Sequence, residues 1–175
     1  ASMLAGLFYF VFTTVATGFA IGIQIIVARR FGERNYGRIG VIFQHGAFFV
    51  MLLGMFLFSI LYFFSDQLLL RLIDSPNIYE ASLDYIKYRR FGIAFVCFNF
   101  LYRALYVGIS NTKVITYSTV IMAVVNIFLD YSLIFGHFGF PQMGIAGAAL
   151  ASLCAEISAF LFFLLYSYIT LRKKE

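Results

Sequence analysis

The chain has 175 residues, of which 62% are hydrophobic, 20% are aromatic and only 12% are charged. A soluble domain is about one quarter charged, so this composition excludes an ordinary soluble fold and indicates a membrane protein. The formal net charge of +5 therefore gives no indication of nucleic-acid binding, and we expect no nucleic-acid partner.

Five apolar stretches are long enough to cross a bilayer, which takes about 20 residues. They cover residues 3–28, 39–64, 86–109, 114–135 and 144–171. Both prolines, Pro76 and Pro141, fall between these stretches, as uninterrupted helices require. The sequence thus predicts an all-α membrane protein in which residues 1–175 form one bundle of five transmembrane helices. The apolar segment 65–74 fits either a short interfacial helix or an extension of the second span.

Basic residues predict the orientation of the spans, because they gather in cytoplasmic loops. The connections and tail that carry them contain Arg29, Arg30, Arg34, Arg38, Lys113, Arg172, Lys173 and Lys174. The first and third connections and the tail are therefore predicted to be cytoplasmic, and the chain is predicted to start on the outer side. An odd number of spans with an outside start, and a first residue other than Met, favour a piece of a longer protein.

One basic cluster disagrees with this orientation, because Lys87, Arg89 and Arg90 open the third stretch on its predicted outer side. Snorkelling of these side chains to the headgroups would make them tolerable. Pairing with Glu80 and Asp84 is the alternative.

Asp130 lies near the end of the fourth stretch, and Asn126 precedes it by one helical turn. An ionisable side chain at membrane depth costs several kcal/mol, so it is a functional-site hypothesis by default. Counting about 1.5 Å per residue from the outer ends places Asp130 about 7–8 Å deep, Asn126 about 14 Å and Ser152 about 12 Å deep. Their carboxylate, amide and hydroxyl oxygens suit a hard cation such as sodium, and the carboxylate could carry a proton instead. The alternative is an interfacial Asp130 that is capped by water or paired with an arginine.

Glu156 is a second acid inside the membrane and a secondary candidate for the same site. It follows Ser152 by one turn and lies about 18 Å from the outer end of the last span. At that depth we expect it to face a polar cavity or Arg103, in either a functional or a structural role.

Small residues recur at a spacing of four in the first and last stretches. They are Thr14, Gly18 and Gly22 in the first stretch, and Gly144, Ala148 and Ser152 in the last, where Gly147, Ala151 and Ala155 add to the row. Such rows allow helices to approach closely, so we interpret both as packing seams.

The chain contains no zinc-protease pair, no Walker-type loop, no Cys/His metal cluster and no serine-nucleophile elbow. These motifs carry hydrolytic and phosphoryl-transfer chemistry, so we expect no enzymatic activity and no cofactor other than a coupling ion. Cys97 and Cys154 each lie within an apolar stretch, and we interpret both as free thiols.

Four segments together resemble the multidrug and toxic compound extrusion (MATE) transporters. They are residues 22–33 (GIQIIVARRFGE), 103–113 (RALYVGISNTK), 126–136 (NIFLDYSLIFG) and 144–152 (GIAGAALAS). The resemblance implies that the five spans correspond to helices two to six of a twelve-helix, two-lobed transporter in the plasma (inner) membrane. The remainder of that transporter, the first helix and the second lobe, would be a partner of this chain.

The resemblance also implies a function, which is the export of drugs or other organic compounds by cation-coupled antiport. The family's coupling site matches Asn126 and Asp130, and Ser152 stands where a Thr is common. A further Asp of the family's first helix has no counterpart here. The expected partners are a small organic substrate, a sodium ion or proton, and membrane lipid.

Two alternatives stay open. A lipid-linked saccharide flippase of the same superfamily should carry cations facing its cavity, and Arg103 is the only plausible interior cation in the sequence. A non-transporting membrane scaffold would use the small-residue seams for assembly.

Overall fold

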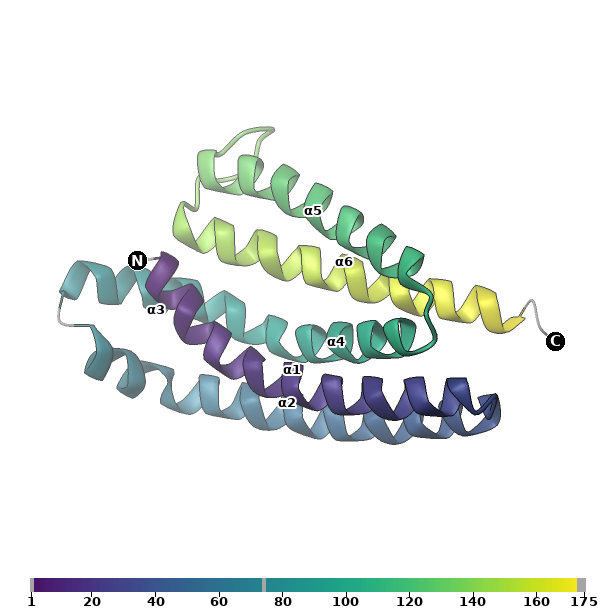
Figure 1. Cartoon of the computed structure of the whole chain (residues 1–175). Coiled ribbons are helices and arrows are strands. Elements are labelled where there is room, and N and C mark those ends of the chain that lie inside the picture. Colours follow the sequence, from purple (N-terminus) through teal and green to yellow (C-terminus); the bar gives the residue numbers. More distant parts are fainter. Residues whose placement is uncertain (1, 74, 173–175) are drawn as a thin grey trace.

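The computed structural model describes residues 2–73 and 75–172, and all regular secondary structure within these ranges is helical. The helices are α1 (Ser2–Gly32), α2 (Tyr36–Leu72), α3 (Pro76–Arg89), the 3₁₀ turn η1 (Arg90–Gly92), α4 (Ile93–Gly108), α5 (Thr112–Phe135) and α6 (Ile145–Arg172) (Figure 1). The predicted all-α fold is confirmed.

Five segments of the described chain are long and apolar enough to cross a membrane: Met3–Gly32, Tyr36–Leu72, Pro76–Gly108, Thr112–Phe135 and Ile145–Thr170. This confirms five spans, but the third one starts at Pro76 and not at residue 86. Pro76 occupies the first turn of α3, where its missing N–H removes no helical hydrogen bond. The polar residues Glu80 and Asp84 hid this part of the helix from a reading based on hydropathy.

The helix α2 runs without a break to Leu72, so the described part of segment 65–74 is not a separate interfacial helix. Asp74 lies outside the described residues. Leu61, Ser65 and Leu69 are all buried, at 0%, 3% and 1% exposed. Their spacing of four keeps them on one face of the helix. The alternative interpretation, an extension of the second span, is therefore correct.

Successive spans run in alternating directions (Figure 1). The connection after α1, the connection after α4 and the C-terminal end of α6 lie together at one end of the bundle. The start of α1, the connection after α2 and the connection after α5 lie at the other end. The connections predicted to be cytoplasmic from their basic residues thus share one end, which we call the basic end.

The helix α4 packs between α1, α2 and α6. It approaches α1 closely at Gly108, where an added Cβ would lie 2.6 Å from Cγ1 of Val27. Val27 itself is fully buried. Glycine is therefore needed at the end of α4 to let the two helices meet.

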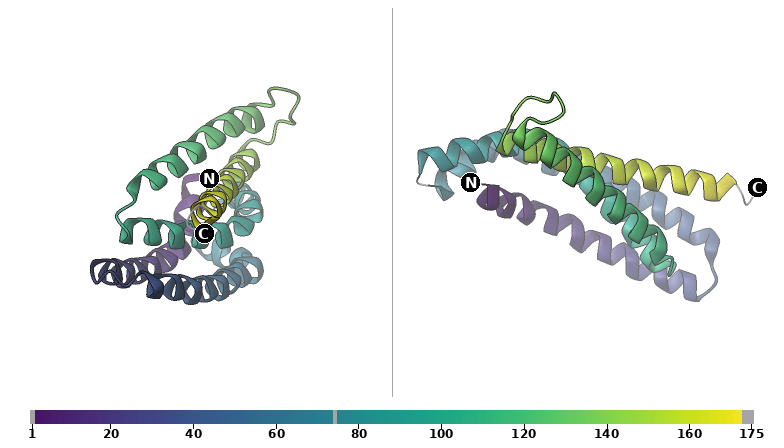
Figure 2. Two further views of the ribbon diagram at one scale, coloured as in Figure 1. Left: turned by 90° about the vertical axis from the view of Figure 1, so that its right-hand side faces the viewer. Right: turned by 90° about the horizontal axis from the view of Figure 1, so that it is seen from above.

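The helix α5 packs chiefly on α6, and the left view of Figure 2 shows it on the side of the bundle away from α2. The contact is closest at Gly147, where a Cβ would lie 2.8 Å from the carbonyl oxygen of Leu133. The predicted seam on α6 is thus present, and Gly147 is one of its predicted members, whereas an added Cβ at Gly144 would have no atom within 4 Å. The predicted seam on α1 is wrong for the described residues, since Gly18 and Gly22 have no atom within 4 Å of an added Cβ.

Candidate functional site

A cavity of about 300 Å³ lies where α3, α5 and α6 meet. It is lined by Arg89, Met122, Ala123, Asn126, Ser152, Ala155 and Glu156. The structure therefore brings together three of the four predicted site residues, one from α5 and two from α6. Their amide, hydroxyl and carboxylate oxygens surround a space large enough for a hydrated cation.

Asp130 does not line this cavity, although it lies only one helical turn from Asn126. Its side chain is partly buried, and Oδ1 is a buried atom with no hydrogen-bond partner. No ion pair in the described part of the chain involves this carboxylate. The alternative in which Asp130 pairs with an arginine is therefore not seen.

Glu156 forms an ion pair with Arg89 of α3, with 2.5 Å between Oε1 and the guanidinium nitrogen Nη1. The two side chains are only 10% and 14% exposed. The guanidinium also lies over the ring of Tyr9 in α1, 4.4 Å from the ring centre, a position in which a cation is attracted to the ring face. The Arg89–Glu156 pair thus joins α1, α3 and α6.

This pairing corrects one prediction, because Arg103 was the expected cationic partner of Glu156. Arg103 is exposed in the described chain, whereas Arg89 lies inside the bundle. The earlier start of the third span explains the difference, since Arg89 then lies near the middle of the span Pro76–Gly108 and not at its opening. The expectation that Glu156 faces a polar cavity is met.

The other members of the basic cluster have different surroundings. Lys87 donates to Asp84 at 2.8 Å on the exposed face of α3, which is one of the two arrangements expected for the cluster. Arg90 lies over the ring of Tyr62 in α2, 4.5 Å from its centre.

Several polar atoms around the Arg89–Glu156 pair are buried without a partner in the described chain. They are Oε2 of Glu156, Oδ1 of Asn99 and the hydroxyl of Tyr9. Asn99 is held in place because its amide donates to the carbonyl oxygen of Glu156 at 3.0 Å. Buried polar atoms without partners are costly, so this cluster has spare capacity to bind a proton, a water molecule or a cation.

A second cavity, of about 260 Å³, lies on the α1 side of the same ion pair. Tyr9, Thr13 and Tyr85 line it together with Arg89 and Glu156. The ion pair therefore separates two cavities, one that reaches Asn126 and Ser152 and one that reaches α1.

A glycine makes room for the acid. An added Cβ at Gly92, in η1, would lie 2.5 Å from Oε2 of Glu156. The carboxylate of Glu156 therefore fits against η1 because this position has no side chain.

Sequence reasoning missed Arg89, Tyr9 and Asn99 as parts of the site. A signal for Arg89 was available in the charge balance, because a mid-membrane acid requires a nearby cation and three basic residues stand in the third span. No comparable signal marked Tyr9 or Asn99, since aromatic and amide side chains are common in such helices. Cys97 and Cys154 are free thiols, as predicted.

A bundle of five helices that are long and apolar enough to cross a membrane defines a multi-pass membrane protein. Residues 1–132 match the family model described as MatE, and the chain therefore belongs to this family of transporters, which are not enzymes.

The chain is 30% identical over 172 residues to the probable multidrug resistance protein NorM of Agrobacterium fabrum, covering 95% of this chain and 36% of that protein. It is also 30% identical over 168 residues to the probable multidrug resistance protein YoeA of Bacillus subtilis, covering 95% and 35%. The chain thus spans about a third of the length of the curated relatives that it matches.

Solved structures show the same fold. A transporter of the MOP superfamily from Pyrococcus furiosus, whose binding pocket is described as having reverse polarity, superposes with a TM-score of 0.85 at 23% identity. The match covers 97% of this chain and 38% of that one. An inward-facing multidrug resistance MATE transporter superposes with a TM-score of 0.80 at 21% identity. That match covers 94% of this chain and 36% of the other chain.

Proposed function

We propose that this chain forms part of one lobe of a cation-coupled antiporter that exports organic, often cationic, compounds. In this proposal a sodium ion or proton binds at Asp130, with Asn126 and Ser152 as neighbouring ligands. Glu156 lies at the same cavity in a secondary role.

The observation that carries the proposal is the difference between the two intramembrane acids. Glu156 has a cationic partner in Arg89, whereas Asp130 has none in the described chain and keeps a buried oxygen without a partner. An arriving cation therefore meets a net negative charge at Asp130 and a neutral pair at Glu156. Because charge interactions are strong inside a protein, this difference favours Asp130 as the binding residue.

Coupling would follow from differential affinity. A ligand shifts a conformational equilibrium only when it binds one state more tightly than the other. Cation entry at Asp130 would favour the state with low affinity for the exported compound, in the alternating-access cycle typical of such transporters.

The test is dye export by cells that produce the full-length protein. We expect Asp130→Asn to abolish export at normal expression, because the substitution removes the charge and keeps the shape. Asp66→Asn is the matched control, since Asp66 is an exposed acid near the end of α2, and we expect it to keep full export. Undiminished export by Asp130→Asn would refute the role of Asp130.

The driving ion requires a separate measurement. Vesicles that contain the purified full-length protein would be given a sodium gradient or a proton gradient alone. Only the gradient of the coupling ion should drive uptake of the dye, and only when Asp130 is present.

One observation bears on the flippase alternative. The sequence argument against it was that Arg103 alone could be an interior cation, and Arg89 now stands inside the bundle. Its charge is balanced by Glu156, however, so the described site offers no free cation for a pyrophosphate. Transport of a lipid-linked saccharide by the full-length protein, without dye export, would favour that alternative. The scaffold alternative predicts that Asp130→Asn and Glu156→Gln have no effect on transport.

A further inference from the structure

A groove runs between α1 and α2 on the surface of the bundle, and two adjoining cavities define it. Each cavity has a volume of about 280 Å³. They share Ile26, Val41 and Ile42, so together they form one continuous depression, which we call the α1–α2 groove.

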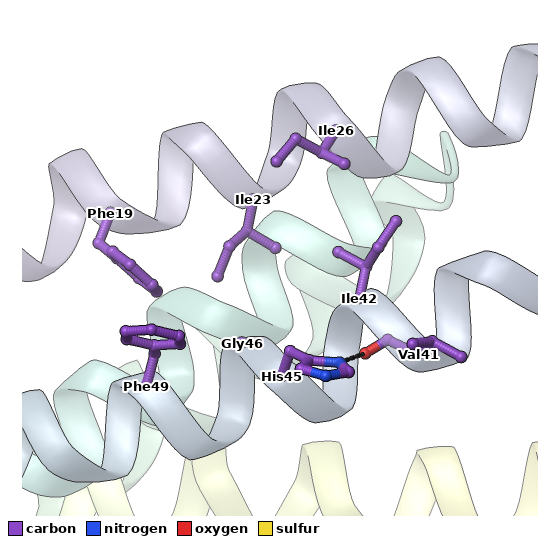
Figure 3. Close-up of a pocket in the computed structure, with 8 residues that line it drawn as sticks. All are labelled: Phe19, Ile23, Ile26, Val41, Ile42, His45, Gly46 and Phe49. Atoms are coloured by element: carbon purple, nitrogen blue, oxygen red, sulfur yellow. Dashed lines mark hydrogen bonds between the residues drawn. The ribbon is translucent and has the colours of Figure 1, made fainter.

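The two ends of the groove differ in chemistry. At the basic end of the bundle it is lined by Arg30 and Arg38. Toward the middle of the helices it is almost wholly apolar, and the rings of Phe19 and Phe49 lie there with their centres 5.9 Å apart. Figure 3 shows these two rings facing each other across the groove, one from each helix.

The only polar side chain in the apolar part is His45, which is turned along its own helix. Its Nδ1 donates to the carbonyl oxygen of Val41 at 2.8 Å (Figure 3). The groove therefore presents hydrocarbon along its length and positive charge at one end.

The length of the groove matches one leaflet of a bilayer. Arg38 and Phe49 are eleven residues apart on α2, which corresponds to about 16 Å along the helix. Half of a hydrocarbon core is about 15 Å thick. With the arginines at headgroup level, the pair of phenylalanines lies near the middle of the membrane.

The charge at this end is only partly neutralised. Glu33 accepts hydrogen bonds from Arg29 at 3.1 Å and from Arg30 at 2.7 Å, and these bonds lower the pKa of Glu33 below its usual range. The glutamate is therefore ionised and balances one of the four arginines in residues 29–38. Arg38 forms no ion pair in the described chain.

We propose that the α1–α2 groove binds one anionic phospholipid of the leaflet at the basic end. Arg38 and the free face of Arg30 hold the phosphate, since a guanidinium forms paired hydrogen bonds to phosphate oxygens. One acyl chain lies along Ile26, Val41 and Ile42 and ends at the Phe19–Phe49 pair. This site is separate from the proposed coupling site, because α1 and α2 line it, whereas Asn126, Asp130 and Ser152 lie on α5 and α6.

The test uses the full-length protein in bilayer nanodiscs and tryptophan quenching by brominated lipids. The chain contains no tryptophan, so Val41→Trp places a reporter inside the groove. Quenching by brominated phosphatidylglycerol is compared with quenching by brominated phosphatidylcholine, and the parent protein supplies the background. We expect stronger quenching by phosphatidylglycerol, with a relative affinity of about fivefold for each arginine that contacts the lipid.

Two controls make the test specific. Phe56→Trp places the reporter on the exposed face of the same helix, 15 residues farther from the basic end, and should be quenched equally by both lipids. Arg38→Gln should remove about a fivefold preference from Val41→Trp, whereas Arg34→Gln should leave most of it. Arg34 is an exposed arginine of the same cluster that does not line the groove.

Three results would overturn the proposal. Absence of quenching in Val41→Trp would mean that the rest of the transporter covers the groove. Equal quenching by the two lipids would mean that the groove accepts lipid without regard to charge. If Arg38→Gln and Arg34→Gln reduced the preference for phosphatidylglycerol equally, anionic lipid would be attracted to the basic surface in general and not to a defined site. Inorganic phosphate should not compete, because the apolar groove contributes to binding. None of these results depends on dye export, so they are independent of the proposed function.

Discussion

Removal of both partners of the Arg89–Glu156 pair should destabilise the protein by less than the sum of the two single removals. Each single substitution, Arg89→Gln or Glu156→Gln, leaves one charge inside the bundle without its partner. Because the side chains are only 14% and 10% exposed, water in the adjoining cavities replaces that partner only in part. Loss of one member of a buried ion pair costs about 3–5 kcal/mol.

The two single variants should also differ from each other. In Glu156→Gln, the guanidinium of Arg89 keeps its contact with the ring of Tyr9, which is worth about 0.5–2 kcal/mol. In Arg89→Gln, the carboxylate of Glu156 keeps no cationic neighbour in the described chain. We therefore expect Arg89→Gln to be the more destabilised of the two.

The assay is a double-mutant cycle on the full-length protein in nanodiscs, with the free energy of unfolding as the measured quantity. The double variant should lose less than the sum of the single variants, by a coupling energy of about 1–3 kcal/mol. The exposed pair of Lys87 and Asp84, with side chains 53% and 57% exposed, is the matched control and should show a coupling of about 1 kcal/mol or less. Additive losses at Arg89 and Glu156 would refute the view that this ion pair connects α3 to α6.

Three glycines provide further predictions. Gly147→Ala should destabilise the full-length protein by about 1–3 kcal/mol, because its Cβ would meet the carbonyl oxygen of Leu133; Gly22→Ala, on an open face, should leave the melting temperature unchanged or raise it. Gly92→Ala should push the carboxylate of Glu156 away from Arg89. The loss in free energy of unfolding caused by Gly92→Ala should be smaller in a Glu156→Ala background. An equal loss in both backgrounds would contradict the contact between Gly92 and Glu156.

The fold could be predicted largely from the sequence, because long apolar stretches leave a chain few alternatives in a membrane. The predicted bounds of the spans were wrong where a helix continues through polar residues. The third span extends back to Pro76 through Glu80 and Asp84, where a hydropathy average falls although the helix continues. Its buried residues in this part, Ser82 and Ile86, are too few to produce an apolar stretch. The sidedness of the membrane stays a prediction.

The site was harder to predict, because depth along a helix does not determine the direction of a side chain. Counting residues placed Asn126 and Ser152 at similar depth, and both line the same cavity. Four residues advance a helix by slightly more than one turn, which rotates Asp130 by about 40° from Asn126. The cavity is lined from α5 by Met122, Ala123 and Asn126, so Asp130 lies one turn beyond the last of the α5 residues that reach it. Glu156 was expected to face a polar cavity or Arg103; the cavity is present, but the cation is Arg89, which the predicted start of the third span had placed near the membrane surface.

The positions of the charges suggest why a single lobe would contain one acid that is paired with a cation, Glu156, and one that is not, Asp130. An ion pair such as Arg89–Glu156 fixes α6 against α3 and α1, and Asn99 adds a bond from α4 to the backbone of Glu156. By contrast, α5 packs chiefly on α6, and Asp130 has no fixed charge partner in the described chain. If a cation binds at Asp130, as proposed above, it changes the charge of a helix that packs chiefly on α6 alone, while the neutral pair holds α1, α3 and α6 together. A lobe built in this way can respond to ion binding by a movement of α5 relative to a stable frame, as coupling to a transport cycle requires.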